Sequence, residues 1–129
     1  MKTLKYIGVP WVSGGKSIKG FDCWGMVQHW YQTRLNKKLP DTPTDPKDLL
    51  AVARKMESEQ NSERWAEISE PTRNCVVAMG KNSKVSHVGI YIGDDLVLHC
   101  SREAGKCVAQ PLFKLYKHWR ILKFYVPNN

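Results

Sequence analysis

Residues 20–31 read GFDCWGMVQHWY and place a cysteine, Cys23, just ahead of a run with helical periodicity. Apolar side chains recur there at three-to-four spacing, which predicts a helix over residues 22–35 with one apolar stripe. Cys23 then lies at the helix start, where free backbone N–H groups favour an anion, so we expect a lowered thiol pKa and a nucleophile. The alternative is that Cys23 is a small buried hydrophobe, the common fate of a free cysteine.

Two strand-like runs in the second half of the chain predict a hairpin. Residues 86–92 read SHVGIYI and residues 96–101 read LVLHCS, with a three-residue loop predicted at residues 93–95. The other predicted elements are strands over residues 75–79, 107–110 and 121–126 and a short turn or helix over residues 111–116. Helices followed by a mostly antiparallel sheet indicate the α+β class, with the N-terminal helix packed on the sheet.

The register of this hairpin brings two histidines together. If residues 93–95 form the loop, Ile92 faces Leu96 and Gly89 faces His99. His87 and His99 then lie diagonally across one polar face, roughly 7–8 Å apart at Cα, and Gly89 leaves room between them. A thiol nucleophile needs an imidazole base, and that base needs an orienting group, so the pair fits both roles. The alternative is two unrelated histidines on a polar sheet face.

The rest of the chain carries weaker signals. Residues 8–20 are rich in glycine and read as an irregular loop. Prolines predict an extended connector after residue 39, and a second helix follows over residues 45–56. His29 is expected in solvent and His118 in a structural role. The length of 129 residues fits a single domain over residues 1–129.

Composition narrows the classes of function. The net charge of +8 and the pI near 9.4 suit an anionic partner, but the basic residues are dispersed, so no specific nucleic acid is expected. No stretch approaches the ~20 apolar residues of a membrane span, and the N-terminus lacks the pattern of a signal peptide. A zinc site from His99, Cys100, Cys107 and His118 is conceivable, but neighbouring strand residues point to opposite faces. We therefore expect no metal and no cofactor.

Four separated motifs resemble a known family. They are PWVSGG at residues 10–15, GFDCWG at 20–25, SHVGIYIGD at 86–94 and LHCS at 98–101. Together they resemble the NlpC and p-sixty family of cell-wall cysteine peptidases, over residues 6–126. The version with a tryptophan after the cysteine is similar to that of bacteriophage tail-assembly and tail-tip peptidases. The resemblance implies a papain-like fold and cleavage of the D-glutamate–diaminopimelate bond in peptidoglycan stem peptides.

The resemblance also implies roles for individual residues. Cys23 would be the nucleophile, His87 the base and His99 the third polar residue. Asp22 and Ser86 match positions that line the pocket for the amino end of the peptide. Asp22 could equally cap the helix, and Ser86 could simply start a strand.

Two positions depart from the family pattern. Trp11 stands where relatives usually carry a tyrosine whose hydroxyl aids the oxyanion site, and it offers only an indole N–H. Arg73-Asn74 replaces a Gly-Asp pair, which is expected to alter only a turn. The resemblance further implies a place in the virion tail, with other tail proteins as partners and the bacterial wall as the site of action. The alternatives are a tail-tip module with little activity and an amidase or acyltransferase of related fold.

Overall fold

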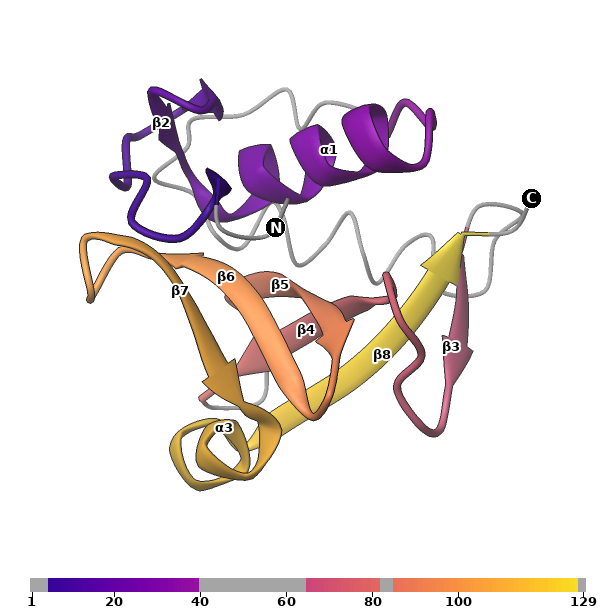
Figure 1. Ribbon diagram of the computed structural model, residues 1–129. Helices are drawn as coiled ribbons and strands as arrows, with labels where there is room; N and C mark the ends of the chain where they lie inside the picture. Colours follow the sequence, from indigo (N-terminus) through magenta and orange to yellow (C-terminus); the bar gives the residue numbers. More distant parts are fainter. Residues whose placement is uncertain (1–4, 40–64, 82–84, 128–129) are drawn as a thin grey trace.

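The computed structural model describes residues 5–39, 65–81 and 85–127, and its fold is α+β with a mostly antiparallel sheet, as predicted (Figure 1). The large sheet has the strand order β3-β8-β4-β5-β6-β7, and all its pairings are antiparallel. Its strands are β3 (Trp65–Ile68), β4 (Val76–Gly80), β5 (His87–Gly93), β6 (Leu96–Ser101), β7 (Lys106–Pro111) and β8 (Ile121–Pro127). The helices of the described ranges are α1 (Cys23–Arg34) and α3 (Leu112–His118), and a small hairpin pairs β1 (Lys16–Ser17) with β2 (Gly20–Phe21).

Most predicted elements match these bounds within one or two residues. The sequence missed β3, whose four residues WAEI show no clear alternation, and it missed the short hairpin inside the glycine-rich loop. The predicted helix over residues 45–56 lies outside the described residues.

The helix α1 begins and ends through local backbone chemistry. Its N-cap is Asp22, whose Oδ1 accepts a hydrogen bond from the Gly25 N–H at 2.6 Å. At the other end the Leu35 N–H donates to the Tyr31 carbonyl, and Asn36 takes a positive φ of 53° that terminates the helix. Cys23 is thus the first residue inside the helix.

Both faces of the sheet are buried. Figure 1 shows α1 on one side of the sheet and α3 on the other. The larger hydrophobic cluster joins α1 to the sheet and includes Met26, Val27, Val88 and Cys100. The smaller cluster lies on the opposite face and includes Val77, Met79, Val97, Leu112 and Leu115. The histidine-bearing face of the hairpin is therefore largely covered, whereas the sequence predicted a polar face.

The hairpin turn is tighter than predicted. Its two central residues are Asp94 and Asp95, with φ of 53° and 62°, and a register shift between Tyr91 and Gly93 absorbs the extra residue. Before this bulge the register is the predicted one, since Ile90 pairs with Leu98. The parity on which the histidine argument depends is therefore intact.

Asn74 does more than alter a turn. It has a φ of 76°, and its side-chain Oδ1 accepts from the Trp30 indole N–H at 3.0 Å. Its backbone carbonyl accepts from the Tyr31 hydroxyl. Two buried aromatic residues of α1 are thus tied to the loop that precedes β4, which fixes how the helix lies on the sheet.

Candidate active site

Cys23 is buried at the N-terminal end of α1, with 4% of its surface exposed. The backbone N–H groups of Val88, Trp24 and Cys23 itself act to lower the pKa of the thiol. Burial acts in the opposite direction and dominates, and together with the nearby Asp22 it raises the pKa of Cys23 from 9.0 to about 12. The expectation of a lowered pKa was therefore wrong: the resting side chain is a neutral thiol, which must lose its proton to a base when it reacts.

His87 and His99 lie in direct contact, in a buried position between the sheet and the residues that follow α3. The His87 Nε2 and the His99 Nδ1 are 2.7 Å apart, and the two side chains are 8% and 3% exposed. Gly89 leaves the space for this contact, because a Cβ there would stand 2.9 Å from the Cβ of His99. The sequence placed this pair correctly across the hairpin but expected it on an open polar surface.

Gln110, on β7, completes a chain of three polar side chains. Its Oε1 lies 2.7 Å from the His99 Nε2. An amide oxygen only accepts, so the His99 Nε2 carries the proton and the His99 Nδ1 presents a lone pair. The His87 Nε2 must then donate to that lone pair, and the His87 Nδ1 is left as the acceptor.

One backbone contact relates His87 to the thiol of Cys23. The Nδ1 atom is the ring nitrogen nearest the main chain, and the thiol of Cys23 contacts the next backbone N–H, that of Val88. Burial and the neighbouring His99 hold the pKa of His87 well below its usual value, so the imidazole is neutral. The resting pair is therefore a neutral thiol beside a neutral imidazole.

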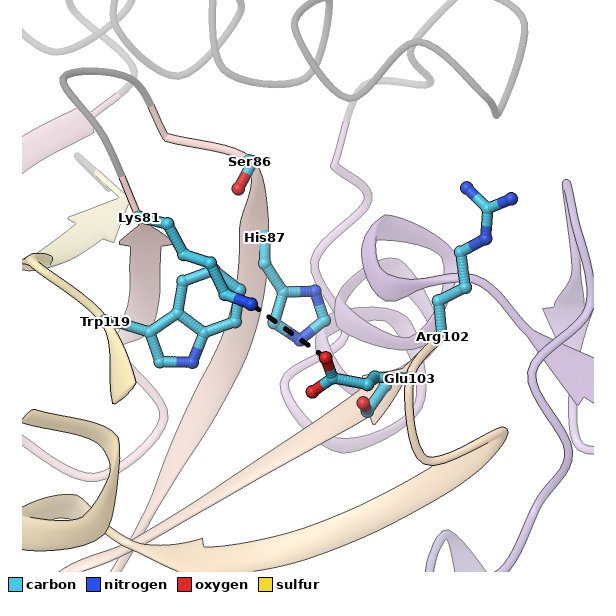
Figure 2. Close-up of a pocket in the computed structure, with 7 residues that line it drawn as sticks. Lys81, Ser86, His87, Arg102, Glu103 and Trp119 are labelled. Carbon is cyan, nitrogen blue, oxygen red and sulfur yellow. Dashed lines mark ion pairs between the residues drawn. The ribbon is translucent and has the colours of Figure 1, made fainter. Parts of the chain in front are cut away.

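A cavity of about 490 Å³ opens next to His87 (Figure 2). Trp119 forms one wall, and its ring stacks on His87 at 5.5 Å between centroids with an angle of 14°. The described residues on the wall are Lys81, Ser86, His87, Ser101, Arg102, Glu103 and Trp119. Cys23 is not among them, so the cavity lies on the histidine side of the thiol.

The three predicted binding residues occupy different places. Asp22 caps α1, and burial raises the pKa of its carboxyl group. Ser86 lies on the cavity wall, immediately before His87. Trp11 packs against the larger hydrophobic cluster, which includes Cys23, and the Arg102 guanidinium carbon lies 5.4 Å from the centre of its ring.

The other two histidines are not part of the hydrogen-bonded series Gln110–His99–His87. His29 is half-buried and bonds through Nδ1 to the Tyr6 hydroxyl at 2.8 Å, so the expectation of a solvent-exposed side chain was wrong. His118 lies at the surface, and its Nε2 is 3.6 Å from a Glu103 carboxylate oxygen.

The other three cysteines are buried in the two hydrophobic clusters. Cys100 and Cys107 face each other across β6 and β7, within the cluster under α1, and all four thiols are free. His99 uses one nitrogen for His87 and the other for Gln110, so neither remains for a metal. Over residues 5–39, 65–81 and 85–127, no group of three or more metal-binding side chains gathers.

Gln110, Trp119, Lys81 and Glu103 were not identified from the sequence. Gln110 could have been, since Val97 pairs with Gln110 and His99 with Val108, which places Gln110 on the same face as His99. Trp119 follows α3 and reaches His87 only through the tertiary fold. Within the described ranges, no helix is both long and apolar enough to cross a membrane.

A helix that begins at a cysteine, packed on an antiparallel sheet that bears the histidines, defines the papain-like class of α+β folds. Among solved structures, the NlpC/p60 domain of the peptidoglycan hydrolase SagA superposes with a TM-score of 0.63 at 18% identity, covering 95% of this chain and 92% of that one. The family described as NlpC/P60 matches residues 8–125. This chain belongs to the NlpC/P60 family.

Two curated relatives are similar to about three quarters of this chain. A probable endopeptidase of Haemophilus influenzae is 29% identical over 101 residues, which cover 78% of this chain and 56% of the relative. A gamma-DL-glutamyl hydrolase of Bacillus subtilis is 34% identical over 99 residues, which cover 76% of this chain and 21% of the relative. This chain therefore spans only part of the length of either protein.

Proposed function

We propose that this protein is a cysteine endopeptidase that cleaves peptidoglycan stem peptides at the bond between D-glutamate and diaminopimelate. The observation that carries the proposal is the hydrogen-bonded series Gln110–His99–His87, which leaves the His87 Nδ1 as an acceptor, one residue before the Val88 N–H that the Cys23 thiol contacts. The names of the relatives, an endopeptidase and a gamma-DL-glutamyl hydrolase, favour this bond.

The proposed reaction follows from the proton positions. The His87 Nδ1 takes the thiol proton as the Cys23 sulfur attacks the carbonyl carbon of the scissile amide. The resulting oxyanion accepts a hydrogen bond from the backbone N–H of Cys23 at the start of α1. The carbon–nitrogen bond breaks as imidazolium His87 returns the proton to the leaving amine, and water, deprotonated by His87, then hydrolyses the thioester.

Buried neutral groups suit this sequence of steps. The thiol and imidazole do not form an ion pair at rest, so charge develops only when the substrate carbonyl is present to accept it. His99 accepts a hydrogen bond from His87 and donates one to Gln110, and it can stabilise the imidazolium without leaving its position. In the proposal, His99 therefore orients the base and does not touch the substrate.

Asp22, Ser86 and Trp11 are proposed as substrate-binding residues. One Asp22 oxygen accepts from the Gly25 N–H, and the carboxylate as a whole could meet the ammonium of a free peptide end. Ser86 adds a hydroxyl beside His87. The Trp11 indole N–H is proposed as a second oxyanion donor, in which case Trp11→Phe should lose roughly 10²–10³ in rate.

The test of the proposal is digestion of purified sacculi followed by mass spectrometry of the released fragments. We expect new amino-terminal diaminopimelate, with no release by Cys23→Ala or His87→Ala. Cys75→Ala is the matched control, because Cys75 is another buried free cysteine that is not bonded to the series Gln110–His99–His87. Wall cleavage retained by folded Cys23→Ala would contradict the mechanism, and products with a different terminus would indicate an amidase or transferase.

We also propose that the protein acts at the bacterial wall as part of a phage tail. The support is the resemblance of the GFDCWG motif, with Trp24 after Cys23, to tail-tip peptidases. Immunodetection of the protein in purified virions tests this proposal. A protein present in virions whose Cys23→Ala variant still supports infection would favour the alternative, a structural tail-tip module.

A further inference from the structure

The cavity beside His87 lies on the side of the thiol where the leaving group departs. In the proposed reaction His87 donates its proton to the leaving amine, so the residue that carries this amine must lie against His87. The cavity has His87 on its wall and Cys23 outside it. The side chain that fills the cavity is therefore that of the leaving residue, and this assignment rests on the proposed function.

An ion pair spans part of this cavity. The Lys81 Nζ lies 3.9 Å from a carboxylate oxygen of Glu103, and the two side chains are 49% and 76% exposed. Figure 2 shows the two side chains reaching toward each other from opposite sides, with Trp119 behind Lys81. Because the Lys81 Nζ is 5.3 Å from the Trp119 ring, and that ring stacks on His87, the pair stands close to the base.

This ion pair is weak enough to be exchanged for contacts with a ligand. The distance is at the outer limit for a salt bridge, and pairs this exposed contribute little to stability. A ligand that carries a carboxylate and an ammonium on one carbon could pair with both side chains at once. A ligand with an ammonium alone would satisfy Glu103 but leave its own charge near that of Lys81.

The cavity also has an excess of positive charge. Arg102 lies on the rim away from Lys81, over the ring of Trp11, so the described residues of the wall include two cations and one carboxylate. Partner groups for Glu103 are Lys81 and His118. A leaving residue with a free carboxylate fits this balance better than one with a bare amine.

We propose that Lys81 and Glu103 form a subsite for the zwitterionic end of the leaving residue, an amino acid group such as that at the far end of diaminopimelate. Lys81 binds the carboxylate and Glu103 binds the ammonium. The subsite selects peptides whose third residue is a diamino dicarboxylic acid over peptides whose third residue is lysine.

The experiment compares two synthetic tripeptides, L-alanyl-γ-D-glutamyl-diaminopimelate and the same peptide ending in lysine. Lys81→Met should lower kcat/KM for the diaminopimelate peptide about tenfold, since it removes one charge-assisted contact. The same change should raise kcat/KM slightly for the lysine peptide, since it removes the repulsion between Lys81 and the ammonium of that peptide. Glu103→Gln should lower kcat/KM for both peptides, because both carry the ammonium. Lys38→Met is the matched control, since it removes the same charge at an exposed position beyond the C-terminal end of α1.

Equal effects of Lys81→Met on both peptides, or no effect on either, would overturn the subsite. If the parent protein cleaves neither peptide, the proposed bond is wrong, and calorimetry then tests the subsite by itself. The uncleaved diaminopimelate tripeptide should bind the parent protein more tightly than the uncleaved lysine tripeptide does, and Lys81→Met should abolish the difference. Equal binding of the two tripeptides would refute the inference independently of activity.

Discussion

Replacement of Gln110 by methionine should test which ring nitrogens of His99 and His87 carry the protons, and should do so more directly than replacement of either histidine. Methionine keeps a side chain of similar length but removes the amide oxygen that accepts from the His99 Nε2. His99 then has a buried donor without a partner. Its proton is better placed on Nδ1, where it can donate to the His87 Nε2, and the proton of His87 must in turn move to Nδ1. The nitrogen proposed as the base for the thiol would lose its lone pair.

The size of the effect follows from the burial of this hydrogen bond. His99 is 3% exposed, so water does not replace the missing acceptor. A buried donor left without a partner costs about 1–3 kcal/mol, and the tautomer balance should shift by that amount, which lowers kcat roughly 5- to 150-fold. KM should change little, because Gln110 lies behind His99 and is not on the cavity wall described above.

Gln110→Glu separates the positioning role from a structural one. A carboxylate still accepts from His99, so activity near neutral pH should stay close to that of the parent. The negative charge raises the pKa of His99, which burial holds low in the parent, and a protonated His99 donates from both nitrogens. His87 must then carry its proton on Nδ1, so this variant should lose activity on acidification at a higher pH than the parent does.

The assays are steady-state kinetics over a range of pH and nitrogen NMR of the histidine tautomers. We expect His99 to be protonated at Nε2 in the parent and at Nδ1 in Gln110→Met. A Gln110→Met protein with unchanged kcat, or with reduced kcat and unchanged tautomers, would refute the reasoning. If Gln110→Met fails to fold, the shifted acid limb of Gln110→Glu still decides the question.

Three further predictions concern the thiol and the fold. The rate of Cys23 alkylation by iodoacetamide should keep rising with pH beyond 9, toward an inflection near 12, and an inflection below 8 would show a resting thiolate. Asn74→Ala should lower the free energy of unfolding by about 2–4 kcal/mol in denaturant titrations, because it leaves the Trp30 indole N–H without its acceptor and places an alanine at a positive φ. Asn74→Gly removes the same acceptor without the backbone strain, so it should lower the free energy of unfolding by less, and equal losses for the two variants would contradict the strain component. Asp22→Ala should cost about 1 kcal/mol through loss of the helix cap, Asp22→Asn should recover most of it, and thermal unfolding of both variants checks this.

The fold and part of the site could be predicted because they depend on local patterns. Helical spacing after Cys23 and the alternation in residues 86–101 determine α1 and the hairpin, and the parity of the turn determines which side chains share a face. The turn itself was predicted one residue too long, but the bulge at Gly93 preserved the parity. The contact between His87 and His99 was thus accessible from the sequence, whereas its burial was not.

The parts that could not be predicted depend on residues distant in sequence. Trp119 covers His87 only because the chain between α3 and β8 passes the start of β5, where His87 lies. Lys81 follows β4 and Glu103 lies between β6 and β7, so their ion pair joins two separate loops. Asn74 binds Trp30 and Tyr31 across more than forty positions. No local pattern carries such contacts, so they could not be predicted from the sequence.

The pKa of Cys23 shows why position on a helix alone misleads. The helix N-terminus stabilises a negative charge by about 0.3–1 kcal/mol, and by up to about 2 kcal/mol where partly buried. A rise from 9.0 to about 12 corresponds to about 4 kcal/mol in favour of the neutral thiol, so burial wins over the helix. A buried thiol beside a neutral imidazole is consequently stable until a substrate arrives, and the proton order from Gln110 to His87 then matters more than the field of the helix. Burial of the two histidines is what lets Gln110 fix the positions of their protons. If His99 were exposed, water could bond to either of its nitrogens, and Gln110 would no longer decide which nitrogen of His87 carries the lone pair.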